Sequence, residues 1–205
     1  MNRSKNDAST FGAIYTDRRW GHGESASGPG SSLSATNLVR QALPAVLSKL
    51  EISTIVDAPC GDMNWMKSLD YKFERYVGID IVPELIERLR TEDFPPNFHF
   101  QVGNLTTDIL PSADAVFCRD CLVHLPFDHI HQAIKLFRSA GYRYLFATTF
   151  TDRDENADCE LGRWRVLNMQ AGPFNWPEPI ELIRERNYIN TQDKYRDKSL
   201  GVWEF

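Results

Sequence analysis

Short apolar segments that each end in a polar or glycine-containing loop recur along the first 150 residues of this chain. These segments span residues 53–58, 75–79, 97–102, 113–118 and 142–150. Segments with apolar residues at spacings of three and four, typical of amphipathic helices, cover residues 35–50, 83–90 and 127–139. This alternation of strands and helices predicts an α/β fold, in which a parallel sheet carries helices on both faces.

The two ends of the chain have different patterns. Residues 1–32 are rich in serine, glycine and asparagine, which is typical of a mobile arm, but Phe11, Tyr15 and Trp20 favour packing onto the domain over a pocket. Residues 151–178 are polar and predict a long loop. Two late apolar segments, 180–186 and 199–205, predict an antiparallel pair of strands at the sheet edge, with a helix as the alternative for the first.

The expected organisation is a single domain over residues 1–205. It has an N-terminal arm or lid at 1–32, a ligand-binding core at 33–150, an acceptor loop at 151–178 and an edge hairpin at 179–205. A length of 205 residues suits one large domain. A further helix is expected to begin within 64–69.

Charge and hydropathy exclude several classes of protein. The net charge of −5 and the lack of a basic run argue against non-specific nucleic-acid binding, although a specific RNA contact through a local patch stays open. The longest apolar runs are far shorter than the roughly 20 residues that span a bilayer. The N-terminus has no apolar segment of the kind that secretory signals carry, so we expect a cytoplasmic protein with no membrane contact.

The four cysteines are expected to be reduced. They are Cys60, Cys118, Cys121 and Cys159. Cys118 and Cys121 have the spacing of half a zinc site or of a redox pair, but no second pair completes a tetrahedral set. The prediction is therefore buried structural thiols and no metal.

In a doubly wound parallel sheet, ligands bind beyond the carboxyl ends of the strands. Four loops start there, at residues 57–65, 80–82, 103–105 and 118–124. Gly61 in the first loop allows the backbone to approach a ligand closely. Asp80 follows Asp57 by about 20 residues, an offset at which an acidic residue commonly accepts hydrogen bonds from ribose hydroxyls.

These loops, in this order and spacing, resemble those of class I S-adenosylmethionine-dependent methyltransferases. The resemblance covers residues 35–150 and implies a Rossmann-like, seven-stranded, mostly parallel sheet with an antiparallel C-terminal edge hairpin and helices on both faces. It implies S-adenosylmethionine as the cofactor, with the first loop around its methionine moiety, Asp80 at the ribose, Asn104 at the adenine amino group, and Cys118 and Arg119 beside the sulfonium. The expected cofactor-binding residues are Trp20, Ser27, Gly28, Asp57, Pro59, Cys60, Gly61, Trp65, Asp80, Ile81, Asn104, Leu105, Cys118 and Arg119.

The first loop departs from the glycine-rich pattern of that family, since Pro59 and Met63 stand where glycines are usual and only Gly61 remains. A looser resemblance links the chain to a bacterial subgroup of small methyltransferases that is often associated with glycan or surface-polysaccharide genes. That second resemblance uses residues 20–31, 57–65, 118–125 and 197–203.

Methyl transfer to a hydroxyl needs a group that removes the hydroxyl proton. Asp120 and His124, in the loop that follows residues 113–118, are the candidate bases. The structural alternatives are a carboxylate that orients Arg119 and a histidine that packs against the backbone. The same choice applies to Trp20, Ser27 and Gly28, which either line the cofactor pocket or belong to a mobile arm.

The function expected from these residues is methyl transfer from S-adenosylmethionine to a hydroxyl of a sugar or another small polar acceptor. The alternative is a methyltransferase-like subunit that binds the cofactor without catalysis. A nicotinamide-dependent dehydrogenase is disfavoured because residues 58–63 lack the Gly-x-Gly-x-x-Gly pattern. A nucleic-acid methyltransferase would need a basic face, for which the sequence offers only Arg18, Arg19, Arg163 and Arg165. The sequence predicts no particular oligomeric state.

Overall fold

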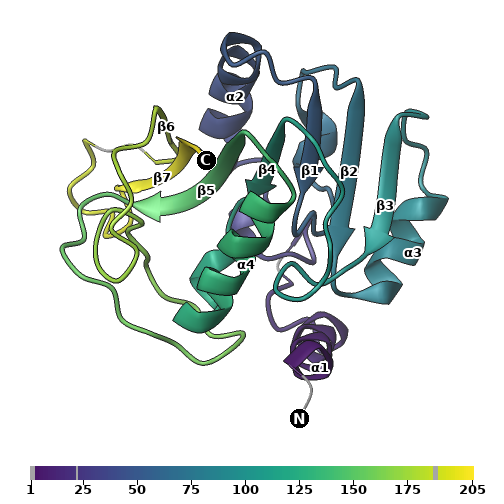
Figure 1. Cartoon of the computed structure of the whole chain (residues 1–205), viewed down its shortest axis with the longest axis horizontal. Helices are drawn as coiled ribbons and strands as arrows, with labels where there is room; N and C mark the ends of the chain where they lie inside the picture. Colours follow the sequence, from purple (N-terminus) through teal and green to yellow (C-terminus); the bar gives the residue numbers. More distant parts are fainter. Residues whose placement is uncertain (1–2, 22, 187–188) are drawn as a thin grey trace.

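The structure is a computed structural model that describes residues 3–21, 23–186 and 189–205. Across these residues, seven strands form one sheet in the order β3-β2-β1-β4-β5-β7-β6 (Figure 1). The strands are β1 (Thr54–Asp57), β2 (Arg75–Asp80), β3 (Phe98–Val102), β4 (Ala115–Cys118), β5 (Tyr144–Phe150), β6 (Glu181–Arg184) and β7 (Lys198–Glu204). Neighbouring strands from β1 to β5 are parallel, and β7 runs antiparallel to β5 and β6. The predicted mostly parallel sheet with a reversed edge strand is confirmed.

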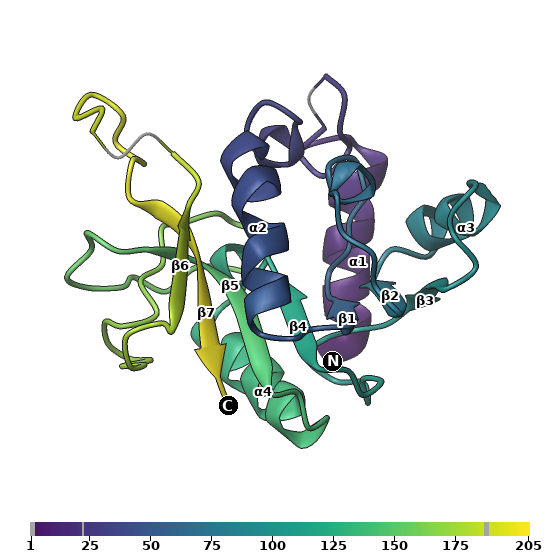
Figure 2. The same ribbon diagram turned by 90° about the horizontal axis from the view of Figure 1, so that it is seen from above.

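Helices cover both faces of the sheet, as predicted. Helix α2 (Asn37–Lys49) and helix α3 (Pro83–Thr91) bury Leu43, Leu47 and Ile86 against one face. Helix α4 (Phe127–Ser139) buries Ile130 and Phe137 against the other. Figure 2 shows α2 and α4 on opposite sides of β4, β5 and β7. The central strands are buried on both faces, which explains their uninterrupted apolar sequences.

The N-terminal arm contains a helix that the composition did not predict. Helix α1 (Arg3–Thr16) lies beyond the carboxyl ends of the parallel strands (Figure 1). Its sequence is polar and includes Gly12, so local propensity gives it little support. Tertiary contacts stabilise it instead, since Asp7 and Ile14 are buried and Phe11 packs against the core. After α1 the arm continues to the short 3₁₀ turn η1 (Pro29–Ser31).

Two further predictions are settled by the structure. The helix expected within 64–69 is wrong, because this segment forms only the 3₁₀ turn η2 (Met66–Ser68). Trp65 and Met66 are both buried there. The segment with two alternatives is strand β6, and the polar stretch 151–178 forms neither helix nor strand, as expected of a loop.

The sheet register brings the loop-starting residues to one edge. Asp57, the last residue of β1, pairs in register with Gly78 of β2 and Phe117 of β4, and Asp80 ends β2 opposite Val102. The acidic ends of β1 and β2 are therefore neighbours at the carboxyl edge of the sheet. In the described part of the chain, no helix has the length and apolar character needed to cross a membrane.

Candidate functional site

A cavity lies at the carboxyl ends of β1 to β4, and the N-terminal arm forms its outer wall. Residues of α1, among them Phe11 and Tyr15, line it together with the loops that follow the strands. The cavity brings together most of the residues that the sequence singled out. They are Trp20, Ser27, Asp57, Pro59, Cys60, Gly61, Trp65, Asp80, Ile81, Asn104, Leu105, Arg119, Asp120 and His124.

Two of the expected cofactor-binding residues are not part of the cavity wall. Gly28 has φ +101° and lies against the backbone of Trp20, where it turns the arm. Cys118 is fully buried in the sheet, in contact with Cys121. All four cysteines are free, as expected. Among the described residues, no cluster of histidine, cysteine and acidic side chains has the arrangement of a metal site.

Asp57 is a buried acid at the end of β1. One of its oxygens accepts a hydrogen bond from the Tyr76 hydroxyl. Burial disfavours the charged form and raises the pKa of Asp57 to about 7, and the nearby Asp80 carboxyl acts in the same direction. A cationic ligand group beside Asp57 would reverse this cost, so the site favours a ligand with an ammonium or similar charge.

Asp80 and Gly61 meet at the junction of the first two loops. One Asp80 oxygen accepts the backbone N–H of Gly61 at 3.2 Å and the other accepts that of Val82 at 3.0 Å. A carboxylate can accept several hydrogen bonds, which suits the hydroxyl groups of a ligand. Burial raises the pKa of Asp80 to about 6. Gly61 has φ +55°, and a Cβ there would overlap the Ser27 hydroxyl, so this loop requires glycine.

Asp62 fastens the arm to the first loop. Its carboxylate accepts hydrogen bonds from the Ser25 hydroxyl at 3.0 Å and from the Ala26 backbone N–H at 2.6 Å. The Asp62 N–H donates in return to the Ser27 hydroxyl at 3.0 Å. The arm thus covers the cavity through specific polar contacts rather than by loose packing.

Asn104 lies at the end of the cavity near β3, and its amide group is already engaged. Its Nδ2 donates to the Asp7 carboxylate, while its Oδ1 accepts the N–H and the hydroxyl of Thr106. The same Asp7 carboxylate accepts the Thr106 hydroxyl at 2.9 Å and contacts His129 Nε2 at 3.1 Å. The predicted contact of Asn104 with an adenine amino group stays a prediction.

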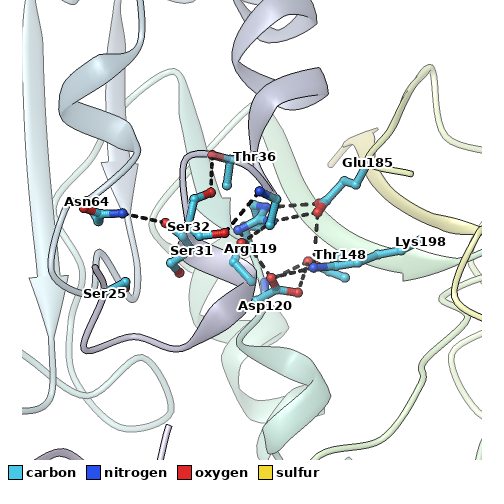
Figure 3. Close-up of polar contacts among 12 residues, drawn as sticks. Ser25, Ser31, Ser32, Thr36, Asn64, Arg119, Asp120, Thr148, Glu185 and Lys198 are labelled. Atoms are coloured by element: carbon cyan, nitrogen blue, oxygen red, sulfur yellow. Dashed lines mark hydrogen bonds and ion pairs between the residues drawn. The ribbon is translucent and has the colours of Figure 1, made fainter. Parts of the chain in front are cut away.

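Arg119 lines the cavity, but its guanidinium is held by the protein. It makes a two-pronged ion pair with Glu185, through Nε at 3.0 Å and Nη2 at 2.6 Å (Figure 3). Nη2 also donates to the Gly30 carbonyl at 2.9 Å. Nη1 lies 3.3 Å from the Asp120 carboxylate. The charge of Arg119 is therefore balanced before any ligand binds.

Asp120 is held in its ionised form. The Lys198 ammonium contacts its carboxylate at 2.6 Å, and the attraction of Lys198 and Arg119 outweighs burial and holds the pKa of Asp120 well below its ordinary range. Such a carboxylate is a weak base but a firm hydrogen-bond acceptor. Its backbone has φ +54°, and its N–H donates to the Thr148 hydroxyl at 2.7 Å.

His124 lies under Trp20 of the arm. The two rings stack with centroids 4.2 Å apart and planes inclined by 29°. Burial lowers the pKa of His124 to about 4, so the ring is neutral at pH 7. The ring hydrogen-bonds to the backbone of Arg163, while its buried Nδ1 has no partner in the described structure.

Some site residues were not identified from the sequence. Asp7 and Glu185 carried no signal, because Asp7 lies in a polar segment and Glu185 lies between Arg184 and Arg186, and both patterns are typical of a solvated surface. Asp62 and Lys198 belong to segments that the sequence singled out, but neither was assigned a role. Arg163 and Arg165 flank an exposed Trp164, and Arg165 donates to the carbonyls of Leu122 and Leu125, so it supports the His124 turn instead of forming a basic face.

Comparison with known proteins identifies the type of domain. Residues 55–140 match the family model described as a methyltransferase domain. This match begins in β1 and ends just after α4, so it includes the loops that carry Asp57, Asp80, Asn104 and Asp120. No curated protein matches the chain significantly.

Three solved structures illustrate the likeness in fold. The methyltransferase domain of bacterial CtHen1 has a TM-score of 0.61 at 15% identity, covering 85% of this chain and 99% of that one. Magnesium protoporphyrin IX methyltransferase (ChlM) from Synechocystis PCC 6803 with bound SAH has a TM-score of 0.54 at 16% identity, covering 73% of each chain. The DhpI–SAH complex has a TM-score of 0.51 at 18% identity, covering 80% of each chain.

Proposed function

We propose that this chain, which is an S-adenosylmethionine-dependent methyltransferase of class I fold, methylates a hydroxyl group of a sugar or another small polar acceptor. The cofactor supplies an activated methyl group when it is bound, and the protein supplies orientation and exclusion of water.

The cavity suits the cofactor at four positions. The Asp80 carboxylate lines the cavity and can accept hydrogen bonds from ribose hydroxyls. Asp57 lies where the ammonium of the methionine moiety would neutralise a buried carboxylate. Gly61 leaves the backbone of the first loop open to close approach. Ile81 and Leu105, at the ends of β2 and β3, offer apolar contacts for a base.

The acceptor would lie at the β4 end of the cavity, near Asp120 and His124. The ionisation states of these two side chains favour a different role for each, one as an orienting group and one as the base. Asp120 is ion-paired with Lys198 and Arg119, so it suits orientation of a polar acceptor by hydrogen bonding. His124 is neutral and has a free ring nitrogen, so it suits removal of a hydroxyl proton as the methyl group is transferred.

The observation that carries the proposal is the neutral imidazole of His124 in the cavity lining, whose buried Nδ1 has no hydrogen-bond partner in the described structure. A buried polar atom without a partner costs free energy, and a hydroxyl that donates to it removes that cost. An amine that is charged at pH 7 would first have to lose a proton to a weak base. A hydroxyl acceptor therefore fits this site better than an ammonium.

A turnover assay with defined acceptors tests the proposal. The full chain is incubated with S-adenosylmethionine and a panel of free sugars, nucleotide sugars and polyols, with primary amines and thiols as matched non-hydroxyl acceptors. We expect S-adenosylhomocysteine release and gain of one methyl group only with hydroxyl acceptors. Methylation confined to the amines or thiols would contradict the proposal.

Replacing His124 tests its role with the acceptor so identified. Glutamine can preserve the bond to the Arg163 backbone but has no basic nitrogen. His124→Gln should lower kcat by about 10²–10⁴-fold with cofactor affinity nearly unchanged. His131→Gln is the matched control, because His131 is an exposed residue of α4 that contacts Phe174. Binding of the cofactor with no turnover on any acceptor would instead favour the non-catalytic alternative.

A further inference from the structure

We propose that Glu185 and Lys198 are positioning residues that fasten the N-terminal arm over the cavity by holding Arg119 and Asp120. Glu185 directly follows β6, and Lys198 begins β7, so both belong to the C-terminal edge hairpin. The inference deepens the proposed function and rests on it only in taking the cavity as the site of the cofactor and acceptor.

Four charged side chains, two of them buried and two partly buried, form one cluster at the ends of β4, β6 and β7 (Figure 3). The Glu185 carboxylate accepts from Arg119 at 2.6 Å and from Lys198 at 3.1 Å. The Asp120 carboxylate accepts from Lys198 at 2.6 Å. The side chains of Arg119 and Glu185 are only 3% and 1% exposed. With two acids and two bases, the cluster is electrically neutral.

The arm closes directly onto this cluster. Arg119 Nη2, which Glu185 orients, donates to the Gly30 carbonyl in η1 at 2.9 Å. Gly30 lies so close that an added Cβ would come within 2.9 Å of Asp120 Oδ2. The next residue, Ser31, accepts from Asn64 Nδ2 at 3.0 Å (Figure 3). The turn at residues 29–31 is thus held from the β4 side by the ion cluster and from the first loop by Asn64.

The edge hairpin acts on the arm through the two residues that follow β4. Both ion pairs, Glu185 with Arg119 and Lys198 with Asp120, are therefore needed to hold the arm. Without Glu185, the Arg119 guanidinium would lose its bidentate partner and rotate toward Asp120. Without Lys198, Asp120 would be left beside Glu185 with a single cation between two acids. In each case the donor aimed at the Gly30 carbonyl is displaced, and the arm that carries Ser27 and Trp20 loses its anchor on this side.

Buried ion pairs require a careful choice of variants. Removing one partner leaves an uncompensated buried charge and can prevent folding, whereas removing an acid and a base together keeps the cluster neutral. Glu185→Gln and Lys198→Met are therefore compared with the double variant. Glu181→Gln is the matched control, because Glu181 lies on β6 and forms an ion pair with the exposed Lys49, far from the arm.

The measurement is amide hydrogen exchange of the full chain without ligand, followed by titration with S-adenosylhomocysteine. We expect the double variant to exchange at least about tenfold faster at residues 25–36, with β5 unchanged, and to bind S-adenosylhomocysteine about tenfold more weakly. Glu181→Gln should match the wild type in both measurements. Lys198→Arg, which retains the charge, should restore most of the protection that Lys198→Met loses.

Two results would overturn the inference. One is unchanged protection of residues 25–36 in the folded double variant. The other is faster exchange of β5 and the arm to the same extent, which would indicate a general structural role. Failure of the wild type to bind S-adenosylhomocysteine would contradict the cofactor site instead, while the ligand-free exchange result would still decide whether the hairpin fastens the arm.

Discussion

Asp7 and Asn104 are hydrogen-bonded across 97 positions of the chain, with Asn104 Nδ2 donating to Asp7 Oδ2 at 3.0 Å. The contact joins α1 to the loop after β3, at the end of the cavity where the adenosine moiety of the cofactor is expected. Because the Asp7 carboxylate also accepts the Thr106 hydroxyl, one buried acid of α1 fixes the arm to two residues of this loop. The outer wall of the cavity therefore depends on a residue that lies outside the region matched by the methyltransferase model.

Asp7→Ala should weaken this wall. The substitution leaves the buried donors of Asn104 and Thr106 without an acceptor, at a cost of about 1–3 kcal/mol in the free energy of unfolding. Chemical denaturation measures that loss, and limited proteolysis should show faster cleavage within α1. Asp17→Ala is the control, because Asp17 forms an exposed ion pair with Arg19 and its loss should change stability very little. Equal effects of the two substitutions would contradict the anchoring role of Asp7.

Asp57→Asn should stabilise the ligand-free protein at pH 8. Because burial raises the pKa of Asp57 to about 7, the folded state binds a proton more tightly than the unfolded state does. The resulting stability is present below pH 4 and is lost as the pH rises through 7. The asparagine variant avoids that loss, which is worth up to about 4 kcal/mol because one pKa unit corresponds to about 1.4 kcal/mol. Urea unfolding at pH 5 and pH 8 should show the stabilisation growing with pH, together with weaker cofactor binding.

Asp114→Asn should have the opposite effect on stability to Asp57→Asn. The Asp114 carboxylate accepts the backbone N–H groups of Ser53 and Thr54 at 2.9 and 2.7 Å, and these bonds with the two hydroxyls hold its pKa below the ordinary value. The contribution of the Asp114 carboxylate to stability is present above the pKa that it has in the unfolded chain. This contribution is lost as the pH falls through its lower pKa in the folded protein. The substitution should therefore destabilise at pH 7, opposite in sign to Asp57→Asn. The same sign for both would show that burial does not control Asp57.

Gly61→Ala should impair cofactor binding although it adds only one methyl group. The left-handed backbone at φ +55° disfavours alanine, and the new Cβ would push the Ser27 hydroxyl away from the first loop. We expect a loss of stability of about 1 kcal/mol or more and a clear loss of affinity for S-adenosylhomocysteine. Gly141→Ala is matched in φ, at +77°, but has open space around it, so it should lose stability without losing affinity. Full affinity in Gly61→Ala would argue against close approach of this loop to the cofactor.

The pH dependence of turnover reports on His124. With its pKa lowered to about 4, kcat/KM should rise through pH 4 and be level at neutral pH, rather than rise near 6.5. Trp20→Ala removes the ring that buries the imidazole, so it should move the midpoint upward toward the ordinary histidine value. Assays with the identified acceptor across this pH range measure both midpoints. An unshifted midpoint in Trp20→Ala would show that burial by Trp20 does not lower the pKa of His124.

The sheet and the loops at its carboxyl edge could be predicted from the sequence because each depends on local pattern. Strands buried on both faces, such as β4 and β5, are continuous apolar runs, and the residue that follows each run starts a loop. The order of the loops then brings Asp57, Asp80 and Asn104 together, since parallel strands end at one edge. The parallel arrangement itself follows from the alternation of strands and helices.

The parts that could not be predicted depend on contacts between distant segments. Helix α1 has no strong apolar face, and its burial of Asp7 depends on partners near residues 104 and 129. Glu185 lies between two arginines and looks like a surface residue, yet its partner Arg119 is 66 positions away. The ionisation of Asp120 likewise depends on Lys198, 78 positions later. Sequence spacing carries no information about such pairings, so the choice between Asp120 and His124 stayed open.

Calorimetric titration of S-adenosylhomocysteine into the wild type and Asp80→Asn decides whether this cavity binds the cofactor. Asparagine preserves size but replaces one of the two acceptor oxygens with a donor, so the variant should lose about 1–3 kcal/mol of binding free energy. Asp70→Asn is the control, because Asp70 is exposed and does not line the cavity. The structure predicts micromolar binding by the wild type and the control, and a marked loss in Asp80→Asn alone. Equal affinity of Asp80→Asn and wild type, or no binding by either, would contradict the assignment of this cavity to the cofactor.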